Sequence, residues 1–214
     1  MINKKQEIIL IGGGGHCCSC IDVIEATGSY NIAGIVDVKQ KLGQKVLGYN
    51  IIAIDEDIAR LSKQYKNFFI SIGHVKTADP RKQKFEQLEK LSVNIVTIVS
   101  PLAHVSKHSE IGRGTIIMHG AVVNANVKVG LNCIINTRAI IEHDSFIGEH
   151  THVSTGAIVN GKCVVGDGTF LGSNSVLADG ITISDDVVVG AGAIVCRPLL
   201  DRGVYVGNPV RRIK

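Results

Sequence analysis

The chain has 214 residues, a formal net charge of +4 and only 4% aromatic residues. So small a charge, with no basic run interleaved with aromatic residues, argues against nucleic acid as a partner, and no apolar stretch is long enough to cross a membrane. The length leaves room for two modest domains.

The chain begins with ten residues that do not resemble a secretory signal peptide. Lys4, Lys5 and Glu7 interrupt them, and they pass directly into a short apolar segment. The expected compartment is therefore the cytoplasm. The six cysteines show no paired metal-ligand spacing, which favours buried thiols and no metal site. They are Cys17, Cys18, Cys20, Cys133, Cys163 and Cys196.

Strands and helices alternate in the first hundred residues. Predicted strands cover 7–11, 32–38, 68–72 and 93–99, and predicted helices cover 21–26, 56–65 and 80–91. This alternation predicts a small parallel sheet with right-handed crossovers, a Rossmann-like α/β arrangement. The boundary is expected at Ser100-Pro101, which gives domains of about 1–98 and 99–214.

A glycine loop, Gly12 to Gly15 followed by His16, joins the first strand to the first helix. Such loops bind phosphate through exposed backbone amides at the positive end of a helix. Asp37, after the second strand, is placed to accept from a sugar hydroxyl. The third glycine of the dinucleotide fingerprint is replaced by Cys17, which argues against NAD. A tight turn without any ligand remains an alternative.

Isoleucine, valine or leucine stands at every sixth residue from Ile111 to Val195, fifteen times without a miss. A period of six fits neither a helix nor a plain strand, but it fits a short strand that turns. Three such hexads close a triangular coil of eighteen residues, and coils stack to bury their aliphatic residues. Glycine follows the aliphatic residue at 112, 130, 148 and 166, where only a residue without Cβ is expected to fit.

One hexad, residues 141–146, departs most from the aliphatic and small pattern, with three ionisable residues in a row. His143 is suited to accept a proton near neutral pH, and the adjacent Asp144 can hold its tautomer and raise its basicity. The pair is a candidate general base with its helper. The alternative is a surface histidine with no role.

Small residues recur every eighteen positions at Thr137, Thr155, Ser173 and Ala191. A thin ligand with amide groups, such as a pantetheine arm, would fit along this column. The alternative is that small residues merely let the coils stack.

The chain resembles the PglD/NeuD-like bacterial sugar acetyltransferases of the hexapeptide-repeat family. The resemblance rests on the GGGGH loop, Asn136-Thr137 upstream of Ile141-Glu142-His143-Asp144, His152-Val153-Ser154 and the terminal Gly207-Asn208-Pro209. It implies an α/β N-terminal domain followed by a left-handed parallel β-helix of hexapeptide repeats. It also implies an acetyl-CoA-dependent N-acetyltransferase that acts on the 4-amino group of a nucleotide-linked 4-amino-4,6-dideoxy sugar for surface glycan synthesis.

The resemblance also assigns roles to residues. It makes His143 the base that deprotonates the sugar amine, with Asp144 beside it and no acyl-enzyme. Cofactor contacts map onto His152, Ser173 and Ala191. Nucleotide-sugar contacts map onto Gly14, Gly15, His16, Asp37, Gly73 and Asn136.

The resemblance also implies a homotrimer with acetyl-CoA between neighbouring prisms. Relatives commonly carry asparagine where this chain has His74, which leaves the sugar and the nucleotide open. Two other functions remain possible from sequence: O-acetylation of a sialic-acid-like sugar, and a non-catalytic sugar-nucleotide sensor or scaffold.

Overall fold

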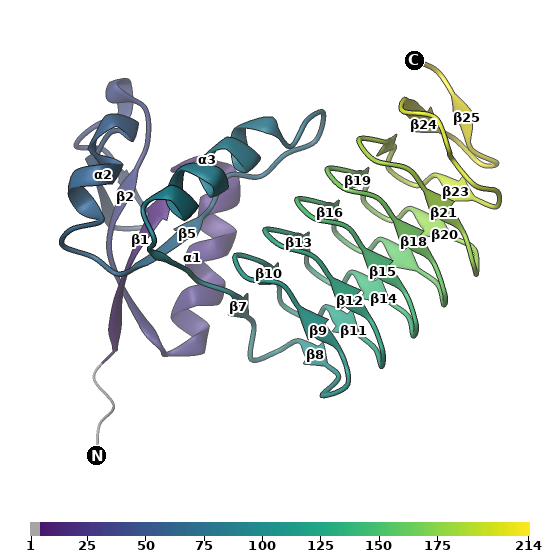
Figure 1. Ribbon diagram of the computed structural model, residues 1–214, viewed down its shortest axis with the longest axis horizontal. Helices are drawn as coiled ribbons and strands as arrows, with labels where there is room; N and C mark the ends of the chain where they lie inside the picture. Colours follow the sequence, from purple (N-terminus) through teal and green to yellow (C-terminus); the bar gives the residue numbers. More distant parts are fainter. Residues whose placement is uncertain (1–4) are drawn as a thin grey trace.

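A computed structural model describes residues 5–214. An α/β domain is followed by a long stack of coils, and the two lie side by side along the molecule (Figure 1). Residues 1–4 lie outside the described residues. They include Lys4, one of the charged residues that argue against a signal peptide.

The N-terminal domain is built on one six-stranded sheet with the order β3-β4-β2-β1-β5-β6. All its pairs are parallel except β3 with β4, so the predicted parallel sheet is confirmed. Its strands are β1 (Gln6–Ile11), β2 (Tyr30–Val36), β3 (Lys45–Val46), β4 (Tyr49–Ala53), β5 (Asn67–Ile70) and β6 (Asn94–Ile95). Its helices are α1 (Gly15–Thr27), α2 (Ile58–Leu61) and α3 (Asp79–Lys90), with 3₁₀ turns η1 (Lys39–Lys41) and η2 (Asp55–Asp57).

Two element predictions in this domain were wrong, and one hairpin was not predicted. The helix expected over 56–65 is only the turn η2 and the single turn α2. The strand expected over 93–99 is two strands in different sheets, because the Val96 amide bonds to Phe68 and the Ser100 amide to Ile117. The β3–β4 hairpin was missed. Its turn residues Leu47 and Gly48 both have positive φ, and a leucine in that place hides the usual turn signal.

The second half of the chain forms three parallel sheets in which each strand pairs with the strand one coil later. Ile116, for example, pairs with Ile134, and Ile134 pairs with His152. The two-residue strands are β7 (Ile98–Val99), β8 (His104–Val105), β9 (Glu110–Ile111), β10 (Ile116–Ile117), β11 (Val122–Val123), β12 (Lys128–Val129), β13 (Ile134–Ile135), β14 (Ile140–Ile141), β15 (Phe146–Ile147), β16 (His152–Val153), β17 (Ile158–Val159), β18 (Val164–Val165), β19 (Phe170–Leu171), β20 (Val176–Leu177), β21 (Thr182–Ile183), β22 (Val188–Val189) and β23 (Ile194–Val195). The stack ends with β24 (Val204–Val206), which pairs antiparallel with β25 (Arg211–Arg212).

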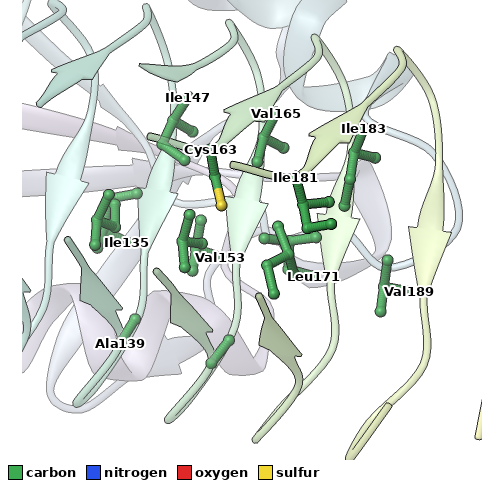
Figure 2. Packing of buried hydrophobic residues seen from close by; sticks show 14 of the residues in the cluster. Ile135, Ala139, Ile147, Val153, Cys163, Val165, Leu171, Ile181, Ile183 and Val189 are labelled. Carbon is green, nitrogen blue, oxygen red and sulfur yellow. The ribbon is translucent and has the colours of Figure 1, made fainter. Parts of the chain in front are cut away.

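The predicted aliphatic column fills the interior of this prism. From Ile117 to Val195 every member is at most 4% exposed. The side chains point inward from all three walls and stack along the axis (Figure 2). Small residues such as Ala139 and Cys163 are also fully buried there. The sixfold register is therefore the hydrophobic core of the second domain.

Each corner of the prism uses one left-handed residue. Every sixth residue from Gly114 to Gly192 has φ between 54° and 74°. The glycines at 112, 130, 148 and 166 are not these residues. They face the next coil, and a Cβ on Gly166 would lie 2.5 Å from the Asp185 amide. The prediction that only glycine fits there is confirmed, and the reason is the close approach of backbone between coils.

The wall of the prism that contains β7, β10, β13, β16 and β19 faces the α/β domain. Its outward residues are buried: Ile98, Ile116, Ile134, His152 and Phe170 are at most 8% exposed. The two domains therefore share an apolar contact, and the site residues on either side of it keep a fixed relation to each other.

The cysteines are free thiols. Cys17, Cys20, Cys133 and Cys163 are buried as predicted, while Cys18 is half-buried and Cys196 is exposed. No helix within residues 5–214 is long and apolar enough to span a bilayer.

Candidate active site

A cavity of about 600 Å³ opens at the carboxyl ends of β1, β2 and β5. In parallel α/β sheets this edge is where ligands bind. The cavity brings together five predicted substrate residues: Gly14, Gly15, His16, Asp37 and Gly73. It is also lined by Ile11, Gly12, Val36, Val38, Lys41, Asp55, Ser71, Ile72, Pro80, Gln83 and Lys84.

The N-terminus of α1 opens into this cavity. Gly14 is its N-cap in extended conformation, no side chain caps the helix, and its first turn contains no acidic residue. A Cβ on Gly14 or Gly15 would meet no atom within 4 Å, so the loop leaves open space above its amides. Free amides at the positive end of a helix dipole bind an anionic oxygen.

Asp37 holds the glycine loop in place. Its carboxylate accepts from the Gly13 amide at 2.7 Å, from the Val38 amide at 2.7 Å and from Lys41 Nζ at 2.9 Å. Partial burial alone would raise the pKa of Asp37, but these hydrogen bonds outweigh it and the pKa is lowered. The carboxylate is therefore ionised, and much of its accepting capacity is already used by the protein.

Two lysines place positive charge at the same cavity. Lys41 pairs with Asp37, and Lys84 Nζ on α3 lies 3.0 Å from the Asp55 carboxylate. Sequence reasoning did not single out either lysine. Both line the cavity together with the carboxylates that they pair with, so their ammonium groups are available at a site whose amides already favour an anion.

His152 joins the prism to the wall of the cavity. Its Nδ1 donates to the His74 carbonyl oxygen at 2.8 Å, and its Nε2 lies 3.0 Å from the Asn136 side-chain amide. Asn136 Oδ1 accepts from the Thr137 amide, which turns the NH₂ group toward His152. His152 is thus a neutral imidazole with its proton on Nδ1, and two predicted contact residues, Asn136 and His152, bind each other.

His74 and His152 are buried between the domains, and the half-buried His16 completes a cluster with them. The ring centroids of His16 and His74 lie 6.2 Å and 5.4 Å from that of His152. Within the described residues, neither ring nitrogen of His74 nor Nε2 of His16 has a hydrogen-bond partner.

All three imidazoles are neutral. Burial, with the charge of Arg81 next, lowers the pKa of His16 to about 3. Burial, with the neighbouring His152 next, lowers the pKa of His74 to about 3, although the nearby Thr169 carbonyl opposes the shift. Burial lowers the pKa of His152 to about 4 even though its bond to His74 favours the proton. A protonated ring is strongly disfavoured here.

Arg81 fixes the cavity wall to the prism. It is fully buried, and its guanidinium donates to the carbonyl oxygens of Ile70, Ile72, Gly114 and Asn132. The first two acceptors belong to β5 and the loop after it, and the last two to corners of the prism. Burial lowers the pKa of Arg81 to about 10, so it stays charged. Sequence reasoning missed this residue.

His143 and Asp144 occupy an exposed corner after β14. His143 Nδ1 lies 2.8 Å from Asp144 Oδ2, and the two side chains are 56% and 43% exposed. Hydrogen bonds from His143 and then from Asn126 lower the pKa of Asp144. The ionised carboxylate accepts a hydrogen bond from Nδ1–H, which leaves the Nε2 lone pair free to take a proton.

The small-residue column is continuous along one edge of the prism. The carbonyls of Thr137, Thr155 and Ser173 accept from the amides of Gly156, Asn174 and Gly192 in the following coils. Ser173 also bonds to Ser154 at 3.1 Å. Thr155 and Ala191 are exposed, and the other two are half-buried. The column is thus accessible, although the carbonyls of its first three residues are already engaged.

The predicted residues therefore fall into three groups. Five line the cavity, and His16 connects them to His152 and Asn136. Ser173 and Ala191 lie on the small-residue column. His143 and Asp144 lie on a different edge of the prism and do not line the cavity. Among residues 5–214, no group of three or more His, Cys, Asp or Glu side chains is placed to hold a metal ion.

Comparisons with known proteins agree with this arrangement. The chain matches the PglD N-terminal domain over residues 7–88 and the bacterial transferase hexapeptide repeats over 144–179 and 162–197. It is 30% identical to PerB, the perosamine N-acetyltransferase of Caulobacter crescentus, solved with CoA and GDP-perosamine. That match covers 97% of each chain with a TM-score of 0.91. The chain belongs to the PglD-like sugar acetyltransferases.

Other solved structures share the whole fold of this acetyltransferase. The acetyltransferase domain of PglB from Neisseria gonorrhoeae FA1090 is 25% identical, with 98% of this chain and 100% of that chain covered and a TM-score of 0.91. WeeI from Acinetobacter baumannii AYE, at 22% identity, covers the same shares with a TM-score of 0.88 and supports the fold alone. A comparison with curated proteins finds no match. The expected architecture, an α/β domain followed by a left-handed β-helix, is confirmed.

Proposed function

We propose that this enzyme transfers the acetyl group of acetyl-CoA to the 4-amino group of a nucleotide-linked 4-amino-4,6-dideoxy sugar, for the synthesis of a surface glycan. Residues 1–98 bind the nucleotide sugar in this proposal, and residues 99–214 carry the acetyl transfer. The proposed compartment is the cytoplasm, as expected from the N-terminal sequence. The solved relative from Caulobacter crescentus binds CoA and GDP-perosamine, which supports a nucleotide amino sugar as substrate.

The cavity beside α1 fits the nucleotide part of the substrate. Its glycine loop offers free amides to a diphosphate, and Lys41 and Lys84 add positive charge nearby. In the proposal, Gly14, Gly15, His16 and Gly73 contact the nucleotide sugar. Asp37 holds the loop and accepts from the sugar or the base with its remaining lone pairs.

The single observation that carries the chemistry is the His143–Asp144 pair. Nε2 of His143 takes the proton from the sugar amine as its nitrogen attacks the thioester carbonyl carbon. The new C–N bond forms, the C–S bond breaks, and the CoA thiolate leaves. Asp144 accepts a hydrogen bond from the Nδ1–H group and stabilises the charged ring. No covalent link to the protein is needed.

Association into a trimer would complete this site. The wall that contains β14 carries an outward column of half-buried aliphatic residues, which suits contact with a second copy. His143 lies two residues after β14, so a neighbouring prism would lie beside it, with acetyl-CoA between the two along Ser173 and Ala191. The column consists of Val122, Ile140, Ile158, Val176 and Ile194. Sedimentation equilibrium should give three times the 22.8 kDa chain mass, and a monomer would contradict the trimer.

Replacing His143 by alanine tests the base. The variant should lose about 10²–10⁴-fold in kcat, the usual contribution of a positioned general base, while its fold is unchanged because the side chain is exposed. Exposed His108 provides the matched control, since His108→Ala should leave kcat unchanged. Near-normal turnover of His143→Ala would remove this residue from the mechanism.

A panel of substrates tests the acceptor. Acetyl-CoA is incubated with amino and hydroxy sugars linked to UDP, GDP or dTDP, and the products are read by mass spectrometry. Transfer to an amine is the expected result. Transfer to a hydroxyl of a sialic-acid-like sugar would replace the proposal by O-acetylation, and binding without transfer would favour a sensor.

A further inference from the structure

One corner of the prism lacks a side chain where the others have one. The second residue after each inward aliphatic residue, from Arg113 to Ala191, carries a side chain everywhere except at Gly161. The backbone at Gly161 is not in the left-handed region, unlike that of Gly156 or Gly168 on either side. The corner itself therefore accepts residues with a Cβ, and the glycine has another cause.

That cause is the imidazole of His143. Gly161 lies in the same corner column as His143, one coil further along, where the Lys162 amide donates to the His143 carbonyl. A Cβ on Gly161 would lie 2.9 Å from Cε1 and 3.0 Å from Nε2 of His143. The next atom on that side is Asp179 Oδ1, at an ordinary 3.5 Å, and no backbone atom is in conflict. Space over Gly161 is thus occupied by the reactive edge of the ring.

We propose that Gly161 is a positioning residue for the general base. It leaves room for the edge of the His143 ring that carries Cε1 and Nε2, so that Nδ1 reaches Asp144. A side chain at 161 would push Nε2 away and rotate the ring from its 2.8 Å bond to Asp144. The inference rests on the proposed role of His143.

The test is a double-mutant cycle of Gly161→Ala and His143→Ala. Gly161→Ala should fold like the wild type, because its backbone conformation suits alanine, and should lower kcat about 10- to 100-fold, as displacement of a reacting group by about 1 Å does. The rising limb of the pH–rate profile should also move, because the ring loses its carboxylate partner. The KM for the nucleotide sugar should change little.

In the His143→Ala background the same substitution should have no further effect, since the ring that it displaces is gone. Glu149→Ala, an exposed residue at the same place in another corner, is the matched control and should leave kcat unchanged. Thermal unfolding of the single and double variants covers the case in which Gly161→Ala folds poorly. Loss of stability through the His143 ring would disappear in the double variant.

The outcomes separate the two claims. If His143→Ala keeps near-normal turnover, the proposed function fails. If His143→Ala is inactive but Gly161→Ala has wild-type kcat, only the positioning role is overturned. Additive losses of activity or stability in the double variant would overturn it as well.

Discussion

Asp144 combines a backbone role with a chemical one. It is the left-handed residue of its corner, with φ of 61°, a conformation that aspartate and asparagine tolerate better than most residues. The turn places its carboxylate back against the preceding His143. A His-Asp sequence at this corner therefore forms the pair from adjacent residues, and Asn126 in the preceding coil also donates to the carboxylate.

Replacing Asp144 by asparagine separates these two roles. Asparagine keeps the corner and the shape of the side chain but removes the negative charge beside the imidazole. The rate should fall less than in His143→Ala, and the rising limb of the pH–rate profile should move to lower pH. Unchanged profiles between pH 5 and 9 would show that the charge has no part in catalysis.

The sequence predicted these residues because they interrupt a regular pattern. His143 and Asp144 are ionisable residues in a repeat of aliphatic and small ones, and the glycine loop follows a strand. Arg81 could not be found in this way. It lies in a charged helix, where arginines usually face solvent, and its four acceptors come from two distant parts of the chain.

At the scale of the coil, two sets of glycines have different physical reasons. Gly148 and Gly166 are required by the backbone of the next coil, whereas Gly180, with φ of +68°, is required by its own dihedral angle and has open space around it. The first set cannot accept any side chain. The second can accept asparagine, which already stands at the equivalent place in Asn126 and Asn174.

Gly166→Ala and Gly180→Asn should therefore differ in stability. Alanine at 166 would place Cβ 2.5 Å from a backbone nitrogen, and overpacking of this kind costs about 1–3 kcal/mol or more. Asparagine at 180 should stay within about 0.5 kcal/mol of the wild type. Urea unfolding followed by circular dichroism measures both, and equal stabilities would contradict the distinction.

The coils were predictable because their period is short and repeated fifteen times, so a single substitution cannot hide it.

The elements of the N-terminal domain were harder to predict. The β3–β4 hairpin has few residues and an atypical turn at Leu47, and the chain crosses from one sheet to another near Thr97 within a single apolar run. Only the pairing partners, which are distant in sequence, determine where that run divides.

At the scale of the whole molecule, the cluster of His16, His74 and His152 makes the domain contact sensitive to acid. The pKa values of His16 and His74 are about 3 and that of His152 is about 4 in the folded protein, against 6.5 for an ordinary histidine. The unfolded chain binds these protons first. Stability should therefore fall as the pH drops below about 6.5, by about 1.4 kcal/mol per pH unit for each histidine, until the folded values are reached.

His74→Asn tests this dependence. At constant protein concentration, the loss of unfolding free energy between pH 7 and pH 5 should be about 2 kcal/mol smaller in the variant than in the wild type. His108→Asn, which changes an exposed histidine, should leave the loss unaltered. Equal losses in wild type and His74→Asn would show that His74 titrates normally in the folded state.

The left-handed corner residues, one in every hexad, also restrict how the prism can change in length. One inserted residue turns the later inward side chains to the outside and moves most corners onto residues less suited to positive φ, such as Leu131 and Thr137. A whole extra coil of eighteen does neither. Between Gly114 and Gly192 the prism can therefore gain or lose residues only in complete coils. Duplication of whole coils is the simplest way for such a prism to become longer.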